Sequence, residues 1–305
     1  MASLLPRDFV DTGAAIAVVQ FNTLAQSLAN NFVGVPERAL EWEHRAPLLG
    51  AEIRRALGPF STAQGPSMPV TPAVVCLQEV DEECCGVLRE AAGLESYEMI
   101  FAKKHSVDDG NAHSDGLLVL YDPVLSLQKR ETLRYKYVDG KPQSQVALLL
   151  RFERFVLATT HLKSGPGEKN AERRANQARQ LVEALQRFEP TLDDTYVGGT
   201  LFKSPPVILA GDLNDTPGAP LFEVLMTQFG LENAYDASNT PLSFTTWKRR
   251  ADGVKKCIED YILVSDARVT SILAPPNEAD VEAGGLLPSL VHASDHVLLA
   301  ARLAF

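Results

Sequence analysis

The sequence has little cysteine and no long apolar segment. Only four cysteines occur among the 305 residues, and none of them forms a Cys-x-x-Cys pair, which argues against a zinc knuckle or a thioredoxin-like redox motif. So low a count is typical of a reducing compartment. No apolar run approaches the length that crosses a bilayer, and the segment from Met1 to Gly13 resembles neither a secretory signal nor an arginine-rich transit peptide. We therefore expect a soluble, cytoplasmic protein without a membrane partner, with a mitochondrial location left open.

Basic and aromatic residues are also scarce. Lys and Arg number 29 against 39 Asp and Glu, which gives a net charge of −10 and a pI near 5.2. Proteins that coat nucleic acids present a basic surface, so this class is disfavoured. Aromatic residues make up 7% of the chain, which gives little support to a long groove in which successive bases stack. A local basic pocket remains compatible with this composition.

Repeats, low-complexity tracts and long linkers are absent as well. The hydrophobic content of 45% is ample for a core. The polar clusters described below are spread from residue 22 to residue 296, and a single site that draws on both ends of the chain favours one domain over residues 1–305. We expect this domain to be a monomer.

Hydrophobic periodicity predicts the secondary structure. Residues 168–188 carry apolar residues every three or four positions and form the clearest helix. A second helix is predicted over 37–57, with a kink or break at Pro47, and two Gly- and Pro-rich loops are predicted over 58–73 and 190–206. Apolar runs predict strands at 16–21, 73–77, 97–102, 116–121, 146–152, 155–160, 207–210, 243–247, 258–264 and 297–305. Strands that alternate with helices early and follow one another later predict a mixed α/β sheet system and not a doubly wound parallel sheet.

Five short polar clusters each lie at the end of an apolar run of strand character. A sheet would deliver their Asn, Glu, His and Asp side chains to one edge. Such a set suits a divalent cation and a phosphoryl group, so a magnesium-dependent phosphoesterase is the leading interpretation. The clusters are Phe21-Asn22-Thr23-Leu24-Ala25, Leu77-Gln78-Glu79-Val80, Thr160-His161-Leu162-Lys163, Gly211-Asp212-Leu213-Asn214-Asp215 and Ser294-Asp295-His296.

Each cluster taken alone has a simpler explanation. Glu79 is either a hard-cation ligand or a helix-capping or surface carboxylate. Asp212 and Asn214 either bind one group together, with Asp212 accepting a proton from water, or form an Asx-turn. His161 is either a structural histidine or, together with Lys163, a site for an anionic oxygen.

The pair Asp295-His296 needs a partner. Asp260 precedes an apolar strand and is a candidate to accept the second ring proton of His296, which would fix the tautomer of the ring. The alternative is a polar pair that caps a strand.

Together, the clusters resemble the endonuclease/exonuclease/phosphatase superfamily, because they follow one another in the order seen there. Asp260-Tyr261-Ile262 completes the set, and the resemblance covers nearly the whole chain. It implies a four-layer sandwich, in which two packed mixed β-sheets lie between outer helices, and a dependence on Mg²⁺, with Mn²⁺ as the alternative. Finer features, above all Thr245-Thr246-Trp247-Lys248-Arg249-Arg250, resemble the nocturnin-like branch of the superfamily, which includes deadenylases.

The resemblance also implies roles for individual residues. The metal would be bound by Glu79 with Asn22 close by and Asp295 near it. Asp212 would deprotonate the attacking water, and Asn214 would position the phosphoryl group. Of the remaining residues, His161 would contact a phosphate oxygen, and His296, paired with Asp260, would stabilise charge in the transition state.

Substrate choice follows from the basic residues near these motifs. A basic pocket in an acidic protein suits a small, highly charged nucleotide better than a polymer. The nocturnin-like resemblance implies removal of the 2′-phosphate of NADP(H), with the expected substrate-binding residues Asn22, Lys103, Lys163, Trp247 and Arg250. One departure is Gly165, where that branch has an arginine, and Arg173 or Arg174 is a candidate replacement.

Two alternatives stay open. A 3′-to-5′ poly(A) exonuclease would use the same metal site on RNA and stack adenine on an aromatic side chain such as Trp247. A catalytically silent nucleotide-binding protein is disfavoured, because the polar set is complete.

Overall fold

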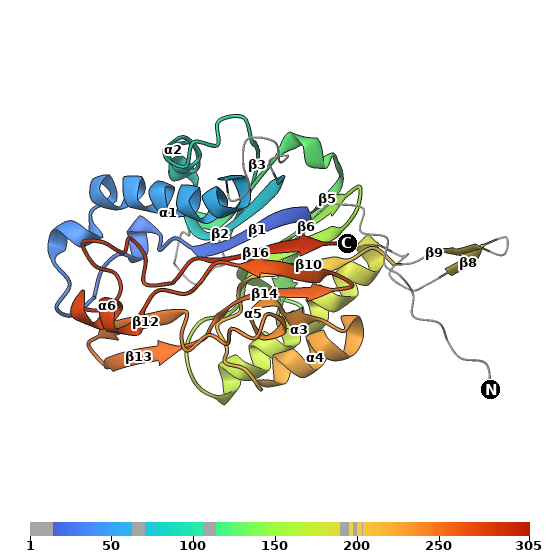
Figure 1. Ribbon diagram of the computed structural model, residues 1–305. Helices are drawn as coiled ribbons and strands as arrows, with labels where there is room; N and C mark the ends of the chain where they lie inside the picture. Colours follow the sequence, from blue (N-terminus) through green and yellow to red (C-terminus); the bar gives the residue numbers. More distant parts are fainter. Residues whose placement is uncertain (1–14, 63–70, 106–113, 190–194, 198–199, 203) are drawn as a thin grey trace.

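Two six-stranded mixed sheets pack face to face, and helices cover both outer faces (Figure 1). The computed structural model describes residues 15–62, 71–105, 114–189, 195–197, 200–202 and 204–305. The arrangement is the four-layer α/β sandwich that the family resemblance implies. No helix within the described ranges is long and apolar enough to cross a membrane.

The first sheet places its first and last strands along the chain, β1 and β16, side by side. Its order is β15-β16-β1-β2-β4-β3, and β1 runs parallel to β2 but antiparallel to β16. The strands are β15 (Arg268–Ile272), β16 (Leu299–Ala304), β1 (Ala15–Asn22), β2 (Ala73–Asp81), β4 (Asp115–Tyr121) and β3 (Glu98–Lys103).

The second sheet has the order β11-β14-β10-β7-β6-β5, with β10 parallel to β7 and antiparallel to β14. Its strands are β11 (Glu232–Asn233), β14 (Asp260–Ser265), β10 (Val207–Asp212), β7 (Val156–His161), β6 (Pro142–Phe152) and β5 (Leu127–Lys136). Two further hairpins lie outside the sheets. They are β12 (Thr246–Arg250) with β13 (Gly253–Cys257), and β8 (Thr195–Val197) with β9 (Thr200–Phe202).

The helices lie in two groups. In Figure 1, α1 and α2 cover the first sheet, and α3 and α4 cover the second. The α-helices are α1 (Trp42–Thr62), α2 (Cys85–Ala91), α3 (Glu168–Phe188), α4 (Pro220–Phe229), α5 (Ala234–Ala237) and α6 (Glu278–Ala283). Short 3-10 turns occur at Gln26–Leu28, Glu37–Leu40, Glu82–Cys84 and Pro123–Leu125.

Alternation along the central strands explains why they read as continuous apolar runs. In β1, Val18 points into the core between the two sheets, whereas Val19 and Phe21 point into the core beneath α1 and α2. Successive side chains of a strand face opposite sides, and here both sides are buried. A strand covered on both faces lacks the polar alternation of a solvent-exposed sheet.

Several element predictions differ from the structure. The helix does not break at Pro47: α1 runs continuously from Trp42, and the chain breaks instead at Glu41, after the preceding 3-10 turn. Pro47 lies early in the helix, and its missing N–H would have bonded only to the carbonyl of Glu43 in the first turn. The predicted loop over 58–73 begins later, because α1 continues to Thr62.

The other differences concern strands. The predicted loop over 190–206 contains the β8–β9 hairpin, and the strand predicted over 243–247 is shifted to β12. Strand β5 was not predicted, because it is an edge strand rich in exposed polar and charged residues, with the sequence LQKRETLRYK. Such strands carry little hydrophobic signal.

Candidate active site

The C-terminal ends of four strands deliver polar side chains to one end of the sandwich. Asn22 ends β1, His161 ends β7 and Asp212 ends β10. In the second sheet, Asp212 stands opposite His161 on one side and Asp260 on the other. The neighbouring Gly211 is required there, because a Cβ at this position would lie 2.2 Å from the carbonyl oxygen of Thr160. The strand ends predicted from the sequence therefore meet.

Glu79 reaches the site through a distortion of β2. The pairing of β2 with β4 shifts register between Leu77 and Val80, and Glu79 has a left-handed φ of 53°. Such a conformation costs about 1–3 kcal/mol for a non-glycine residue and persists where the surrounding structure holds it. A bulge re-aims a side chain near the end of a strand, and here it brings Glu79 to Asn22.

Four side chains form a compact cluster at this edge. The amide nitrogen of Asn22 donates to Glu79 Oε1 at 3.1 Å and to Asp212 Oδ2 at 2.9 Å. His161 Nε2 lies 3.8 Å from Glu79 Oε1 and 3.6 Å from Asp212 Oδ2. The oxygen of the Asn22 amide accepts from the backbone of Leu24 at 3.1 Å, so in this arrangement Asn22 orients the two carboxylates.

The electrostatics of this cluster leave its negative charge unbalanced. Burial, followed by the nearby charge of Lys104, lowers the pKa of His161 well below its usual value of 6.5, so the ring is neutral. Burial, followed by the charge of Asp260, raises the pKa of Asp212 to about 7. Two carboxylates thus face each other across an amide and a neutral imidazole.

Asn214 continues the same strand end. Its backbone N–H donates to Asp212 Oδ1 at 2.9 Å, and its side-chain amide donates to the carbonyl of Leu162 at 3.1 Å. The first bond is that of an Asx-turn. The turn fixes Asp212 and leaves its second oxygen, Oδ2, directed toward Asn22 and His161.

His296 is held as a cation between carboxylates. Its Nδ1 lies 2.8 Å from Asp260 Oδ2, and its Nε2 lies 3.8 Å from Asp212 Oδ2. Burial acts to lower the pKa of His296, but the charge of Asp260, together with the other nearby acids, outweighs it and raises the pKa to about 10. Gln20 donates to the other oxygen of Asp260 at 3.0 Å, so the Asp–His pair predicted from the sequence is built and oriented.

Asp295 faces a set of cations from β12. Lys248 Nζ lies 2.5 Å from Asp295 Oδ2, and an Arg250 nitrogen lies 3.7 Å from the same oxygen. Burial acts to raise the pKa of Asp295, but Lys248 and His296 outweigh it and hold the pKa well below its usual value. Thr246 also donates to the Asp295 carbonyl at 2.8 Å, so alternate residues of β12 point toward Asp295.

Trp247 belongs to the other face of this hairpin. Its ring lies 5.4 Å from that of Phe244 and 3.9 Å from Lys256 Nζ. Because successive side chains of a strand alternate, Trp247 points away from the side on which Thr246, Lys248 and Arg250 meet Asp295. The structure therefore does not bring Trp247 to the cluster.

The remaining basic candidates separate into two groups. Arg250 is at the site, where it also covers the ring of Phe32 at 3.5 Å. Lys163 is half-buried two residues beyond His161. Lys103 is not at the cluster: its side chain is 47% exposed and pairs with Glu82 on the surface at 3.0 Å.

Lys104 was not among the residues predicted from the sequence, but its side chain is the buried one of the Lys103–Lys104 pair. Its side chain is only 9% exposed, and its Nζ lies 2.5 Å from Asp115 Oδ2. The backbone N–H of the next residue, His105, bonds to the carbonyl of Ser144 and so ties this segment to β6 at 2.8 Å. The doublet Lys103-Lys104 was visible, but only strand register shows which of the two faces inward.

Neither of the two candidate arginines on α3 lies at the position of Gly165 with its guanidinium directed to the Asp212 cluster, as far as the contacts of the described residues show. Arg174 is buried and donates to Asp215, to the carbonyl of Lys163 and to the carbonyl of Gly165, at 2.7, 3.0 and 3.0 Å. Arg173 lies against the ring of Tyr137 at 4.8 Å. Arg174 is thus a structural brace of the Lys163–Gly165 segment.

The donor set fits a hard divalent cation. Mg²⁺ prefers carboxylate and amide oxygens, and the cluster of Asn22, Glu79, His161 and Asp212 holds two carboxylates with no cationic member. A second group, Asp212, Asp260 and His296, offers three ligand atoms within 4.8 Å of one another. There, however, the proton of His296 already balances Asp260, so the oxygens beside Glu79 are the better fit.

The sequence matches the Endonuclease/Exonuclease/phosphatase family over residues 19–296. The chain therefore belongs to this family, whose members are metal-dependent hydrolases of phosphoester bonds, and this confirms the resemblance seen in the motifs.

Similarity to individual proteins points to one branch. Nocturnin of Drosophila melanogaster is 28% identical over 330 residues, which cover 94% of this chain but only 46% of the relative. The structure of the human Nocturnin catalytic domain with a bound sulfate anion is 26% identical with a TM-score of 0.68, over 98% of this chain and 96% of that one. ANGEL2, a 2′,3′-cyclic phosphatase, shares the fold with a TM-score of 0.74 and 18% identity, over 95% of each chain.

Proposed function

We propose that the protein is a Mg²⁺-dependent phosphoesterase that removes the 2′-phosphate of NADP(H). The observation that carries the proposal is the position of Asp212: its carboxylate is buried among Asn22, the neutral His161 and the cationic His296. The similarity to Nocturnin supports the proposal, and so does a set of inward-facing cations in a protein of net charge −10.

Asp212 is suited to accept a proton from the attacking water. A general base works best when its pKa lies near the working pH, and burial raises the pKa of Asp212 toward 7. Asn214 fixes Oδ1 of this carboxylate through its N–H, so the basic oxygen is Oδ2. This division of the two oxygens gives the carboxylate one structural and one chemical role.

His296 and His161 meet the phosphoryl group in different charge states. His296 carries a proton near neutral pH, because its pKa is raised to about 10, and so it stabilises charge that develops on phosphoryl oxygens. His161 is neutral and contributes a hydrogen bond. Asp260 keeps the ring of His296 oriented, as an acceptor at Nδ1.

Glu79 would hold the metal, with Asn22 orienting its carboxylate and Asp295 nearby, which leaves Oδ2 of Asp212 for the proton of the attacking water. When bound there, Mg²⁺, or Mn²⁺ in its place, would supply charge neutralisation for the phosphoryl oxygens. Because the cluster lacks a cation of its own, we expect its two carboxylates to repel each other until that charge is supplied.

Lys104 is our candidate for the cation that offsets the arginine absent at Gly165. Its side chain is buried, it lies close enough to His161 to lower the pKa of that ring, and it follows β3, whereas Lys163 follows β7. A single ammonium binds phosphate as a point charge without the bidentate geometry of arginine. We therefore expect a broader phosphate specificity than an arginine fork would give.

The adjacent lysines allow a matched test of this role. We expect Lys104→Met to raise the KM for NADPH about tenfold or more, because a buried charge on the substrate phosphate is lost. Lys103→Met, with the same change of charge, should leave KM within twofold, because its side chain is on the surface. Equal KM values for the two variants would show that Lys104 does not bind the substrate phosphate. Because Lys104→Met also removes the ion pair with Asp115, thermal melting is measured to detect a loss of folding.

The metal-binding role is tested at Glu79. We expect Glu79→Gln to lower the turnover of NADPH by at least about a hundredfold and to raise the Mg²⁺ concentration at half-maximal rate, because one ligand charge is lost. The assay follows release of inorganic phosphate. A variant with wild-type rates at the same Mg²⁺ concentration would show that Glu79 is not a ligand.

The same assay distinguishes NADP(H) from the alternative substrate, poly(A) RNA. Purified protein is incubated with Mg²⁺ and NADPH, and separately with a poly(A) oligonucleotide, while phosphate and AMP are measured. Phosphate from NADPH supports the proposed activity. AMP from poly(A) alone would identify a 3′-to-5′ exonuclease; the orientation of Trp247 away from Asp295 speaks against adenine stacking there.

A further inference from the structure

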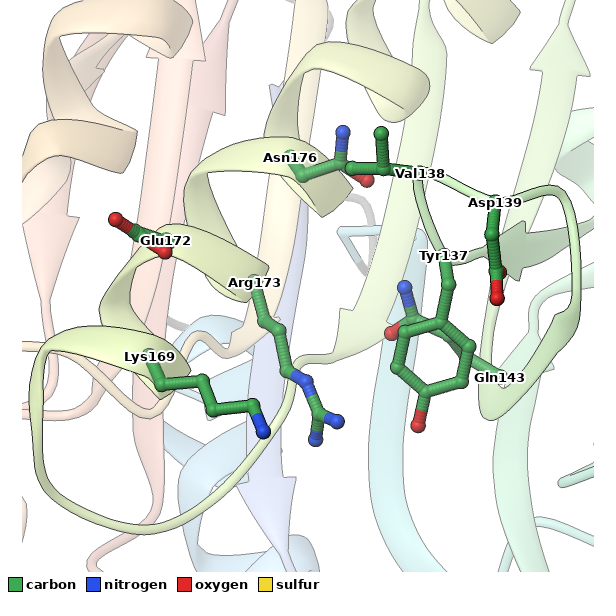
Figure 2. A pocket seen from close by; sticks show the side chains of 8 residues that line it. All are labelled: Tyr137, Val138, Asp139, Gln143, Lys169, Glu172, Arg173 and Asn176. Carbon is green, nitrogen blue, oxygen red and sulfur yellow. The ribbon is translucent and has the colours of Figure 1, made fainter.

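A cleft beside the candidate active site has the chemistry of a nucleotide subsite. It is lined by the turn between β5 and β6 and by the first turns of α3, and it has room for about 370 Å³. Sites for small molecules start at about this size. Figure 2 shows Tyr137 on one side of the cleft and Lys169 and Arg173 on the other.

The charge in this cleft is available to a ligand. Lys169 and Arg173 are four residues apart on α3, and in Figure 2 their side chains extend in the same direction while the Glu172 carboxylate points away from them. Asp139 is paired with Lys141 at 3.1 Å. Among the described residues, neither Lys169 nor Arg173 forms an ion pair, so both cations remain for an external anion.

An aromatic ring and a guanidinium lie together here. The Arg173 guanidinium carbon is 4.8 Å from the centre of the Tyr137 ring. Nucleobases stack on tyrosine rings and on guanidinium planes, and arginine and lysine bind phosphate through charged hydrogen bonds. A nucleotide, which is a base with a phosphate attached, makes both the stacking contact and the charged contact.

The cleft is connected to the active-site edge by a chain of buried amides. Gln177 donates to Gln143 at 2.8 Å and accepts from the backbone N–H of Lys163 at 3.0 Å. Gln143 lies four residues before Ala147 on β6, and Ala147 pairs with Thr160, next to His161. At about 3.3 Å per residue, the cleft lies roughly 13 Å along the strand from that point, within the span of an extended dinucleotide.

We propose that this cleft binds a second nucleotide of the substrate, beyond the nucleotide whose phosphoester is cut. Its base stacks against Tyr137 and Arg173, and its phosphate contacts Arg173 and Lys169. This inference rests on the proposed function for the cut bond. The second nucleotide is either the other half of a dinucleotide such as NADP(H) or the next nucleotide of an RNA strand.

The test compares ligands with one and two nucleotides. Binding of 2′-AMP, NADP⁺ and tetra-adenylate is measured by calorimetry with Ca²⁺ in place of Mg²⁺, for the wild type, Arg173→Ala and Tyr137→Ala. Loss of a stacking or phosphate contact should weaken NADP⁺ or tetra-adenylate about tenfold and leave 2′-AMP within twofold. Arg179→Ala, an exposed arginine on the same helix, controls for the change in net charge.

Each outcome has a defined meaning. A selective loss for NADP⁺ identifies the dinucleotide as the source of the second nucleotide, and a selective loss for tetra-adenylate identifies RNA. Equal effects on 2′-AMP, or no effect of either variant on any ligand, would overturn the proposal. Because binding is measured without turnover, a failure to release phosphate from NADPH would count against the proposed function and not against the subsite.

Discussion

Asp212→Asn is expected to lower kcat for NADPH by about a thousandfold, within the range that general-base catalysis contributes. Asparagine keeps the shape of the side chain and can still accept the N–H of Asn214, but it cannot take a proton from water. The buried position of Asp212, which is 1% exposed, leaves no room for a second carboxylate to swing into its place. Single-turnover phosphate release at saturating NADPH measures the effect directly.

The control for this variant is Asp236→Asn, which removes one exposed carboxylate on α5. It should retain the wild-type rate. Thermal melting should show both variants folded, because asparagine keeps the oxygen that accepts the N–H of Asn214 and loses only the bond from Asn22. A residual rate for Asp212→Asn within tenfold of wild type would mean that another group accepts the proton.

Arg45→Met is expected to lower the free energy of unfolding by about 3 kcal/mol. Arg45 lies on α1, is 0% exposed and donates to the carbonyls of Ala293, Thr23 and Leu24. Burial, partly offset by the charge of Asp295, lowers its pKa to about 10. Removing the guanidinium leaves these buried carbonyls without their donor, which costs their full desolvation.

Urea unfolding followed by circular dichroism measures this effect. Arg54→Met, at an exposed position on the same helix, removes the same charge and should change stability by less than about 0.5 kcal/mol. A similarly small loss for Arg45→Met would show that water or a shifted side chain satisfies the carbonyls. We also expect lower activity, because the loops that carry Asn22 and Asp295 both depend on this arginine.

Site residues were predicted best from the sequence where they directly follow an apolar run of strand character. Asn22, His161 and Asp212 each follow a buried apolar run, and parallel strands end at a common edge, so their meeting was predictable. The bulge that turns Glu79 inward was not, because its left-handed backbone depends on the pairing of β2 with β4.

Residues that act through distant contacts escaped prediction for a related reason. Arg45 lies 248 positions from Ala293, whose carbonyl it binds, and nothing near it in the sequence indicates burial. Lys103 and Trp247 show the same limit for side-chain direction: both were expected at the site, but alternation assigns a face only when the strand and its register are known. For the fold, apolar periodicity predicted the mixed α/β sheets, and the four-layer arrangement followed only from the family resemblance.

Because β1 pairs with β16, the candidate active site can form only after both of these strands have been synthesised. The Ser294 hydroxyl donates to the carbonyl of Asn22 across 272 positions, at 2.6 Å, and the last strand lies beside the first in the middle of the sheet. During synthesis β1 has to wait for residues 294–304 before its sheet is complete, and contacts so far apart in the chain form slowly. A chain that lacks these residues would have neither the β1–β16 pair nor His296, so we expect it to be inactive. Appearance of activity would then report that β1 and β16 have paired.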